Sequence, residues 1–478
     1  MKALKPDCRL VKIILICAGI GLTAGLAVGA TAPTNAPAGP AQAAKPEELP
    51  AWLTVPLSLA DALNIAAAQN ATILKSKQDL EAQFGVAVQT RAIALPQVAI
   101  SSAYRRVAED RLEVFGRGFI PSPNVNSWTL GIQVIQTVYD GGRMQASLRS
   151  ARLLKEQALL DHQTAVADAL LAVRTAYYDA LWATNEIWVR EASVALLQKQ
   201  LDDTKRRFEA GVVPQFNVLR AEVELANAHP PLIRARNNYR IAKQNLVNQM
   251  GLNLPKTVLE DVPLQLSGRL EQEPWDIDLP TALSLALQQR TELASLRKVE
   301  ELRREGVKSA RAGYWPSLQV FAGYGADSRR FTDRFTDEVH GWETGARLQW
   351  NLFDGMLTQG KVRQAQALEQ RAMVDLDDAT RRIELEVRVA YSSFIEAKDV
   401  LKSQEKVTEQ AMEALRLANS RYEAGTGTQL DVLSAQTALT EARTTYVRAL
   451  RDYAVARARL ERAIGAGLKV ETKSAPGP

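Results

Sequence analysis

The chain carries two copies of one pattern. Four segments of its first half return in the second half in the same order. The pairs are LSLADAL (57–63) with IDLPTAL (277–283), ALPQVAISSAY (94–104) with YWPSLQVFAGY (314–324), GIQVIQTVYDGG (131–142) with GARLQWNLFDGM (345–356), and RFEAGVVPQFNVLRA (207–221) with RYEAGTGTQLDVLSA (421–435). The first two pairs are offset by 220 residues and the last two by 214. The repeat predicts that each half builds the same supersecondary unit, with a longer loop in the first half.

Each half predicts the order helix, strand, loop, strand, very long helix, tight turn and shorter helix. We expect helices at 59–93, 144–210, 217–250 and 361–424. The two long helices contain neither Pro nor Gly, and at about 1.5 Å per residue each approaches ~100 Å. Pro230 and Pro231 predict a kink or break in the third helix. The lengths suggest that two short helices stack end to end beside one long helix, and the Ala-rich pattern is typical of close coiled-coil packing.

Period-two alternation marks the strands. Apolar Trp128, Leu130, Ile132 and Val134 alternate with small or polar residues, which predicts a strand with one apolar face. Its expected partner contains Val98, Ile100 and Tyr104, and the second-half strand runs from Trp342 through Leu348 and Trp350 to Leu352. A soluble sandwich would also use such strands, but tryptophans at strand ends are typical of outer-membrane barrels.

Four strands per chain are too few to close a barrel, since the smallest membrane barrels need about eight. Three copies would supply about twelve. The predicted fold class is therefore mainly α with a membrane β-barrel segment. It has two tandem repeats, which build a long α-helical coiled-coil barrel and contribute four strands per chain to a twelve-stranded barrel in a homotrimer.

The N-terminus resembles a secretory signal peptide. Four basic residues precede an apolar run from Ile13 to about Ala30, followed by a small, Pro-rich stretch that reaches Ala44. Removal between Pro33 and Lys45 would also remove both cysteines, Cys8 and Cys17, so the mature chain has no disulfides or thiolate metal ligands. It would lower the formal charge from +5 to +2, because the segment carries four basic residues and Asp7. A nucleic-acid partner is therefore not indicated.

These patterns divide the chain into five segments. They are a signal and processing region at 1–44, a first repeat at 45–250, an equatorial linker at 251–276, a second repeat at 277–466 and a C-terminal tail at 467–478.

The ordered set of motifs resembles the TolC-type outer-membrane efflux protein family. The resemblance rests on the signal peptide, LSLADALNIAAAQN, LPQVAISSAY, YDGGR, RRFEAGVVPQFNVLRAE and their second-half echoes through RYEAGTGTQLDVLSAQTALTEAR. It spans residues 57 to about 466. It implies a homotrimer with a twelve-stranded barrel in the outer membrane of a Gram-negative bacterium and a twelve-helix tube in the periplasm. It also implies a periplasmic adaptor (membrane fusion) protein and an inner-membrane transporter of the RND or ABC type, with solutes exported through the tube.

Two glycine turns join the long helices to their return helices. We expect Gly211, Val212 and Val213 in the first turn and Gly425, Thr426 and Gly427 in the second to be exposed tips. Gly after a long helix favours a left-handed cap, which is a structural role. The family resemblance adds that these tips dock the adaptor.

The resemblance also implies a constriction near the second tip. Asp431 matches the family's acidic ring, which would attract cations, and its first-half equivalent is Asn217. Ser434 stands where the family often has a second acid, so the ring would carry less charge. Tyr422 could bond Asn217 and latch the closed tip, although Gly427 replaces a basic residue found in some members. An N-cap role explains Asp431 or Asn217 equally well.

An enzyme is not indicated. His162, His229 and His340 lie in different segments without zinc-ligand spacing, and neither a nucleophile elbow nor a phosphate loop is present. We expect no cofactor and no metal. The alternatives are a secreted coiled-coil scaffold without pore activity and a periplasmic binding module.

Overall fold

The computed structural model describes residues 55–108, 126–254, 261–271, 275–328 and 337–466. The expected signal peptide and C-terminal tail lie outside these residues.

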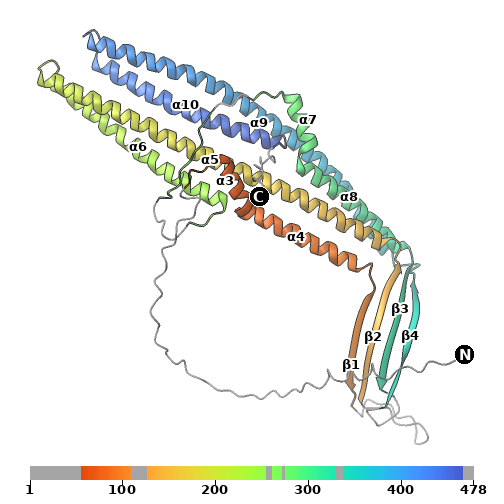
Figure 1. The fold of residues 1–478 in the computed structure, drawn as a ribbon. Coiled ribbons are helices and arrows are strands. Elements are labelled where there is room, and N and C mark those ends of the chain that lie inside the picture. The colour runs from red at the N-terminus through yellow and green to blue at the C-terminus, as the bar shows by residue number, and fades with distance from the viewer. Residues whose placement is uncertain (1–54, 109–125, 255–260, 272–274, 329–336, 467–478) are drawn as a thin grey trace, which may run out of the picture. The chain divides into compact units, whose positions relative to one another are not determined.

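The two halves repeat one order of elements (Figure 1). The first half contains α3 (Leu59–Gln69), α4 (Ala71–Ala92), β1 (Gln97–Arg106), β2 (Asn126–Tyr139), α5 (Arg143–Glu209) and α6 (Gln215–Met250). The second contains α7 (Leu279–Gln289), α8 (Thr291–Arg311), the 3-10 turn η2 (Ala312–Tyr314), β3 (Ser317–Ser328), β4 (Glu338–Gln349), α9 (Leu357–Glu423) and α10 (Gln429–Ala463). The long helices α5 and α9 have 67 residues each.

The helix expected at 59–93 is two helices, and the prediction of one is wrong. Asn70 adopts an extended conformation (φ −61°, ψ 127°) that ends α3 and begins α4. Its Oδ1 accepts hydrogen bonds from the backbone N–H groups of Thr72 (2.8 Å) and Ile73 (3.3 Å). An asparagine side chain can thus replace the helical bonds that the break removes. Arg290 separates α7 from α8 with the same extended backbone (φ −66°, ψ 120°), but without a side-chain cap bond to α8.

The prolines of α6 do not break it. The helix runs from Gln215 to Met250 with Pro230 and Pro231 inside, so of the predicted kink or break the break does not occur. The carbonyls that lose their intrahelical donors belong to Ala226 and Asn227, two exposed residues whose groups water can solvate. Buried side chains on both sides of the prolines hold the helix against its neighbours; these are Val218, Ala221, Leu232 and Ala235.

The four strands form one antiparallel sheet in the order β1-β2-β3-β4. The register aligns Ile100, Ile132, Tyr324 and Trp342 in one row across all four strands. Ile100 is 75% exposed and Trp342 77% exposed. One chain therefore presents a sheet with an uncovered apolar face. Within the described residues, β1 and β4 each have only one strand neighbour.

The helices pack in a fixed lateral order. Helix α5 contacts α4 and α6 on one side and α8 and α10 on the other, and α9 packs against α8 and α10. Figure 1 shows α4 and α6 lying one after the other along α5. Helices α4 and α6 therefore form one lateral edge of the layer, and α9 forms the other.

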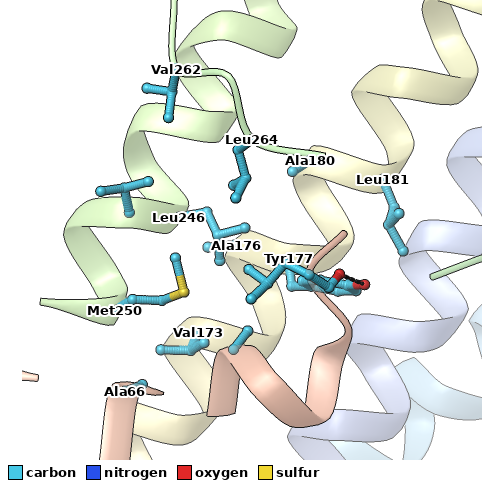
Figure 2. Packing of buried hydrophobic residues seen from close by; sticks show 13 residues of the cluster. Ala66, Val173, Ala176, Tyr177, Ala180, Leu181, Leu246, Met250, Val262 and Leu264 are labelled. Carbon is cyan, nitrogen blue, oxygen red and sulfur yellow. Dashed lines mark hydrogen bonds between the residues drawn. The ribbon is translucent and has the colours of Figure 1, made fainter. Parts of the chain in front are cut away.

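A hydrophobic core holds α3, α5, α6 and the linker together (Figure 2). Its members are Leu57, Ala62, Ala66, Val173, Ala176, Tyr177, Ala180, Leu181, Leu246, Val247, Met250, Val262 and Leu264. Tyr177 Oη donates a hydrogen bond to Leu57 O and accepts one from Gly268 N, both 3.1 Å. Burial raises the pKa of Tyr177. A matching cluster around Phe394 and Tyr453 forms the hydrophobic core of the second half.

Replacing Gly251 tests how closely the end of α6 approaches the break between α3 and α4. Gly251 has φ +78°, and a Cβ there would lie 2.3 Å from Gln69 O. Gly211, the matched control, has φ +73°, but a Cβ there would meet no atom within 4 Å. Gly211→Ala should cost about 1–2 kcal/mol for its left-handed backbone. Gly251→Ala should cost a further ~1–3 kcal/mol for the clash. Denaturant unfolding followed by circular dichroism measures both, and equal losses would contradict the close approach.

Candidate functional site

The two tips have the same helix-ending geometry. Gly211 (φ +73°) and Gly425 (φ +76°) are left-handed. Val212 N donates to Arg207 O at 2.8 Å and Thr426 N to Arg421 O at 2.9 Å, so both turns close with the bonds of a Schellman motif. The predicted tip residues Gly211, Val212, Gly425 and Thr426 are exposed, whereas Val213 and Gly427 are half-buried.

Gly427 occupies a position where the backbone approaches closely. A Cβ at Gly427 would lie 3.0 Å from Arg421 Cβ and 3.1 Å from Arg421 C. Its N–H also donates to Arg421 O at 3.0 Å. Gly427, which replaces a basic residue found in some family members, therefore lies where this turn packs tightly.

The return helices begin differently. Helix α10 has Thr428 as N-cap and Asp431 as the third helical residue, and together they form a capping box. Helix α6 has Pro214 as N-cap, without a side-chain cap bond, and Asn217 is its third residue. The N-cap role considered for Asp431 or Asn217 thus belongs to Thr428 and Pro214.

Asp431 is exposed, and its carboxylate is fixed by Thr428. Asp431 Oδ2 accepts bonds from Thr428 N (2.9 Å) and Thr428 Oγ1 (2.8 Å), while Asp431 N donates to Thr428 Oγ1 (3.2 Å). The bond from the Thr428 backbone contributes most to lowering the pKa of Asp431, and the bond from the Thr428 hydroxyl comes next. The positive charge of Arg421 lowers this pKa further. Ser434 Oγ donates to Asp431 O at 2.9 Å.

The expected Tyr422–Asn217 hydrogen bond does not form within the chain. Tyr422 Oη is buried without a hydrogen-bond partner among the described residues. The guanidinium of Arg207 lies 4.6 Å from the centre of the Tyr422 ring, which is a cation–π distance.

Gln429 of α10, rather than Tyr422, links the α9–α10 pair to the α5–α6 pair. No pattern in the sequence indicated this role. Gln429 is buried, and its Nε2 donates to Asn217 O at 3.2 Å and to Thr204 Oγ1 at 3.3 Å. The only signal in the sequence was its place next to the N-cap. A polar side chain there has no periodic pattern that would reveal its burial.

The histidines do not come together. His162 Nδ1 lies 2.8 Å from Ser76 Oγ, His229 is on α6, and His340 is on β4 beside Glu338. In the part of the chain that the structure describes, no three His, Cys, Asp or Glu side chains are arranged to hold a metal ion. The described helices also include none with the length and apolar character of a membrane span.

Comparison with known proteins identifies the family. The family model described as "Outer membrane efflux protein" matches residues 62–252 and 282–466. The chain belongs to the outer membrane efflux protein family. The TolC-type resemblance seen in the sequence is thereby confirmed.

Two curated relatives and one solved structure agree with this assignment. Outer membrane protein TolC of Vibrio cholerae is 25% identical over 434 residues, covering 87% of this chain and 95% of the relative. The alkaline protease secretion protein AprF of Pseudomonas aeruginosa is 26% identical over 409 residues, covering 84% and 83%. The Campylobacter jejuni CmeC outer membrane channel superposes with a TM-score of 0.74 at 16% identity, covering 86% of each chain. This chain is an outer-membrane channel protein with the mainly α fold of these channels.

The capping box predicts a pH dependence at the second tip. The pKa of Asp431 is lower in the folded chain than its ordinary value of 3.8, so its bonds stabilise the start of α10 above pH ~4 and are lost as pH falls through the folded pKa. Hydrogen-exchange protection of 428–435 should fall on acidification in the native chain. Asp431→Asn should show no such step, because its amide does not titrate in this range. A parallel fall in both proteins would contradict the assignment.

Proposed function

We propose that three copies of this chain form one continuous export channel. It would span the outer membrane as a β-barrel and extend through the periplasm as a tube of helices, with its narrow end at the Gly211 and Gly425 tips. The observation that carries the proposal is that the sheet and the helical layer both end in edges without a partner among the described residues. The sheet ends at β1 and β4, and the helical layer ends at α4 with α6 and at α9.

The sheet supports a threefold assembly. Its edge strands β1 and β4 lack a second strand neighbour within the described residues, and unpaired backbone groups cannot face lipid. Joining β4 of one copy to β1 of the next in three copies would give about twelve strands, an even number within the range of bacterial barrels.

The sheet also carries side chains suited to a lipid boundary. Large apolar residues are exposed where the sheet meets the helices, namely Tyr314, Trp315, Trp350, Leu352, Phe353 and Met356. Trp and Tyr favour the membrane–water interface, where the ring is buried and the polar atom is solvated. A water-soluble scaffold would leave this belt uncovered.

The helical layer has complementary open edges. Along α6, the exposed apolar residues are Phe216, Leu219, Val223, Ile233 and Ile241, and along α9 they include Val374, Val407 and Leu417. Scattered exposed apolar residues are normal, but a row along each lateral edge indicates an interface. Contact of α9 in one copy with α4 and α6 of the next would close a ring of helices.

The tips would dock a periplasmic adaptor, which would link the channel to an inner-membrane transporter of the RND or ABC type. Exposed Val212 and Thr426 are the side chains that these turns present. The energy for transport would come from that transporter, and this chain would supply the path.

Asp431 would form an acidic ring where the tips converge. The carboxylate is exposed and its pKa is lowered by its bonds to Thr428, so it would stay ionised at neutral pH. Three such groups around one axis would attract cations and repel anions. Asn217 would add no charge, Ser434 would contribute no second acid, and Tyr422 would support the closed tip through Arg207.

Assembly state tests the channel directly. The full chain extracted in detergent should give three subunits by native mass measurement, and the trimer should conduct ions in a planar bilayer. A water-soluble product that needs no detergent would support the scaffold alternative. A conducting monomer would contradict the threefold closure.

Asp431→Asn tests the ring. The substitution keeps the size and the acceptor for Thr428 but removes the charge, so the trimer should lose cation selectivity and block by multivalent cations. Glu423→Gln, at an exposed acid at the end of α9, is the control and should change neither strongly. If selectivity persists in Asp431→Asn, the carboxylate only caps its helix.

A further inference from the structure

A groove runs between α9 and α10, away from the tips and the sheet. Its volume is about 790 Å³, within the usual range for small-molecule sites. Its floor is apolar, with Leu385, Val389, Val400 and Val455 among its lining residues.

The groove opens on the face of the helix layer opposite the linker. On α10 it is lined by Asp452, Val455, Arg459 and Arg462. Linker residues Gly268 to Glu271 instead share a second cavity with Ala454, Arg457, Ala458 and Glu461 of the same helix. At 3.6 residues per turn, these two sets point to nearly opposite sides of α10. We place the linker, which adds a further layer on its side of the helices, on the outside of the proposed tube, and the groove then faces the lumen.

Most charges around the groove are already paired. Arg451 Nε donates to Asp179 Oδ1 at 2.6 Å, and Arg462 Nε donates to Asp168 Oδ1 at 2.7 Å. Arg382 pairs with Asp378, Glu386 with Arg290, and Asp452 with Arg451.

Two lining charges are left over. Exposed Arg459 and Glu396 form no ion pair or side-chain hydrogen bond within the described residues, with each other or with any neighbour. They are the two charges free to bind a ligand without breaking a contact inside the chain.

The free charges stand at opposite ends of the part of the apolar floor that contains Val389 and Val455. Phe394 of α9 packs against Tyr453 of α10 with ring centres 5.4 Å apart, which sets the register of this antiparallel pair. Glu396 lies two residues beyond Phe394 toward the tip, and Arg459 six residues beyond Tyr453 toward the sheet. At 1.5 Å per residue, they are separated by about 12 Å along the helices.

We infer that this groove is a lumenal binding site for an elongated zwitterionic amphiphile. Its anion would bind Arg459, its cation would bind Glu396, and its apolar body would lie over Val389 and Val455. The inference rests on the proposed channel. It adds the chemical class of a solute that would bind reversibly to the channel wall. Neither an anionic nor a cationic amphiphile would satisfy both free charges.

The test uses the wild-type trimer in a planar bilayer at neutral pH with three probes of equal chain length. 10-Aminodecanoic acid carries both charges, decanoic acid only the anion and decylamine only the cation. The zwitterion should give the longest blocking events. Arg459→Gln or Glu396→Gln should shorten them about threefold, as expected for an exposed ion pair. The double reversal Arg459→Glu with Glu396→Arg should restore them.

Two further variants test whether the blocking events arise in the groove itself. Arg388→Gln removes an exposed arginine of α9 outside the groove lining and should leave the events unchanged. Ser393→Trp fills the groove and should abolish them while the protein stays trimeric. Loss of the trimer in Ser393→Trp would show that a neighbouring copy covers the groove and would overturn the inference.

The two proposals fail in different ways. A wild-type protein that never conducts would overturn the channel, and with it the lumen. A conducting trimer in which the glutamine variants block like wild type would overturn the groove alone.

Discussion

The unpaired edges of the four-stranded sheet are the constraint on which the rest of the assembly depends. In a bilayer, every backbone N–H and C=O group must be bonded within protein. The strands are the part of the chain that the proposal places there, and β1 and β4 have only one strand neighbour each in the described chain. Closure therefore requires other copies, and three copies would supply twelve strands. Because each sheet continues into the helical layer, the same symmetry would apply to the tube.

The two repeats use different residues to stabilise the break between their short helices. At the break between the short helices, Asn70 Nδ2 donates to Gln249 O at 2.6 Å, and Arg290 Nη1 donates to Arg462 O at 3.2 Å. Both bonds tie the break to the end of the return helix. Arg290 additionally pairs with Glu386, so the second joint is ionic where the first is neutral. At the offset of 214, Gln249 matches Ala463 rather than Arg462, so the two repeats tie the break to the same helix end through neighbouring carbonyls and different donors.

Periodicity and repeats predicted the elements because those signals extend over many residues. The family, the mainly α class and the long helices were accessible in this way. The breaks at Asn70 and Arg290 were not, because a single extended residue interrupts a helix without disturbing its apolar pattern. The continuity of α6 through Pro230 was missed for the opposite reason: neighbouring packing outweighs a local preference. At the tip, matched turns identified Gly211 and Gly425, but Gln429 is defined by contacts with residues more than 200 positions away.

The capping box changes how an acidic ring at Asp431 would behave. Three carboxylates brought together repel one another, and this repulsion raises their pKa values. In the single chain, the bonds from Thr428 lower the pKa of Asp431, so in a ring they would oppose that rise. The same bonds hold the carboxylate against the first turn of α10. Its position would then follow the helix rather than a flexible side chain, and any movement of α10 would move the charge with it. Capping and pore lining would therefore not be competing roles for Asp431, because the capping bonds would fix the place of the carboxylate in the proposed ring.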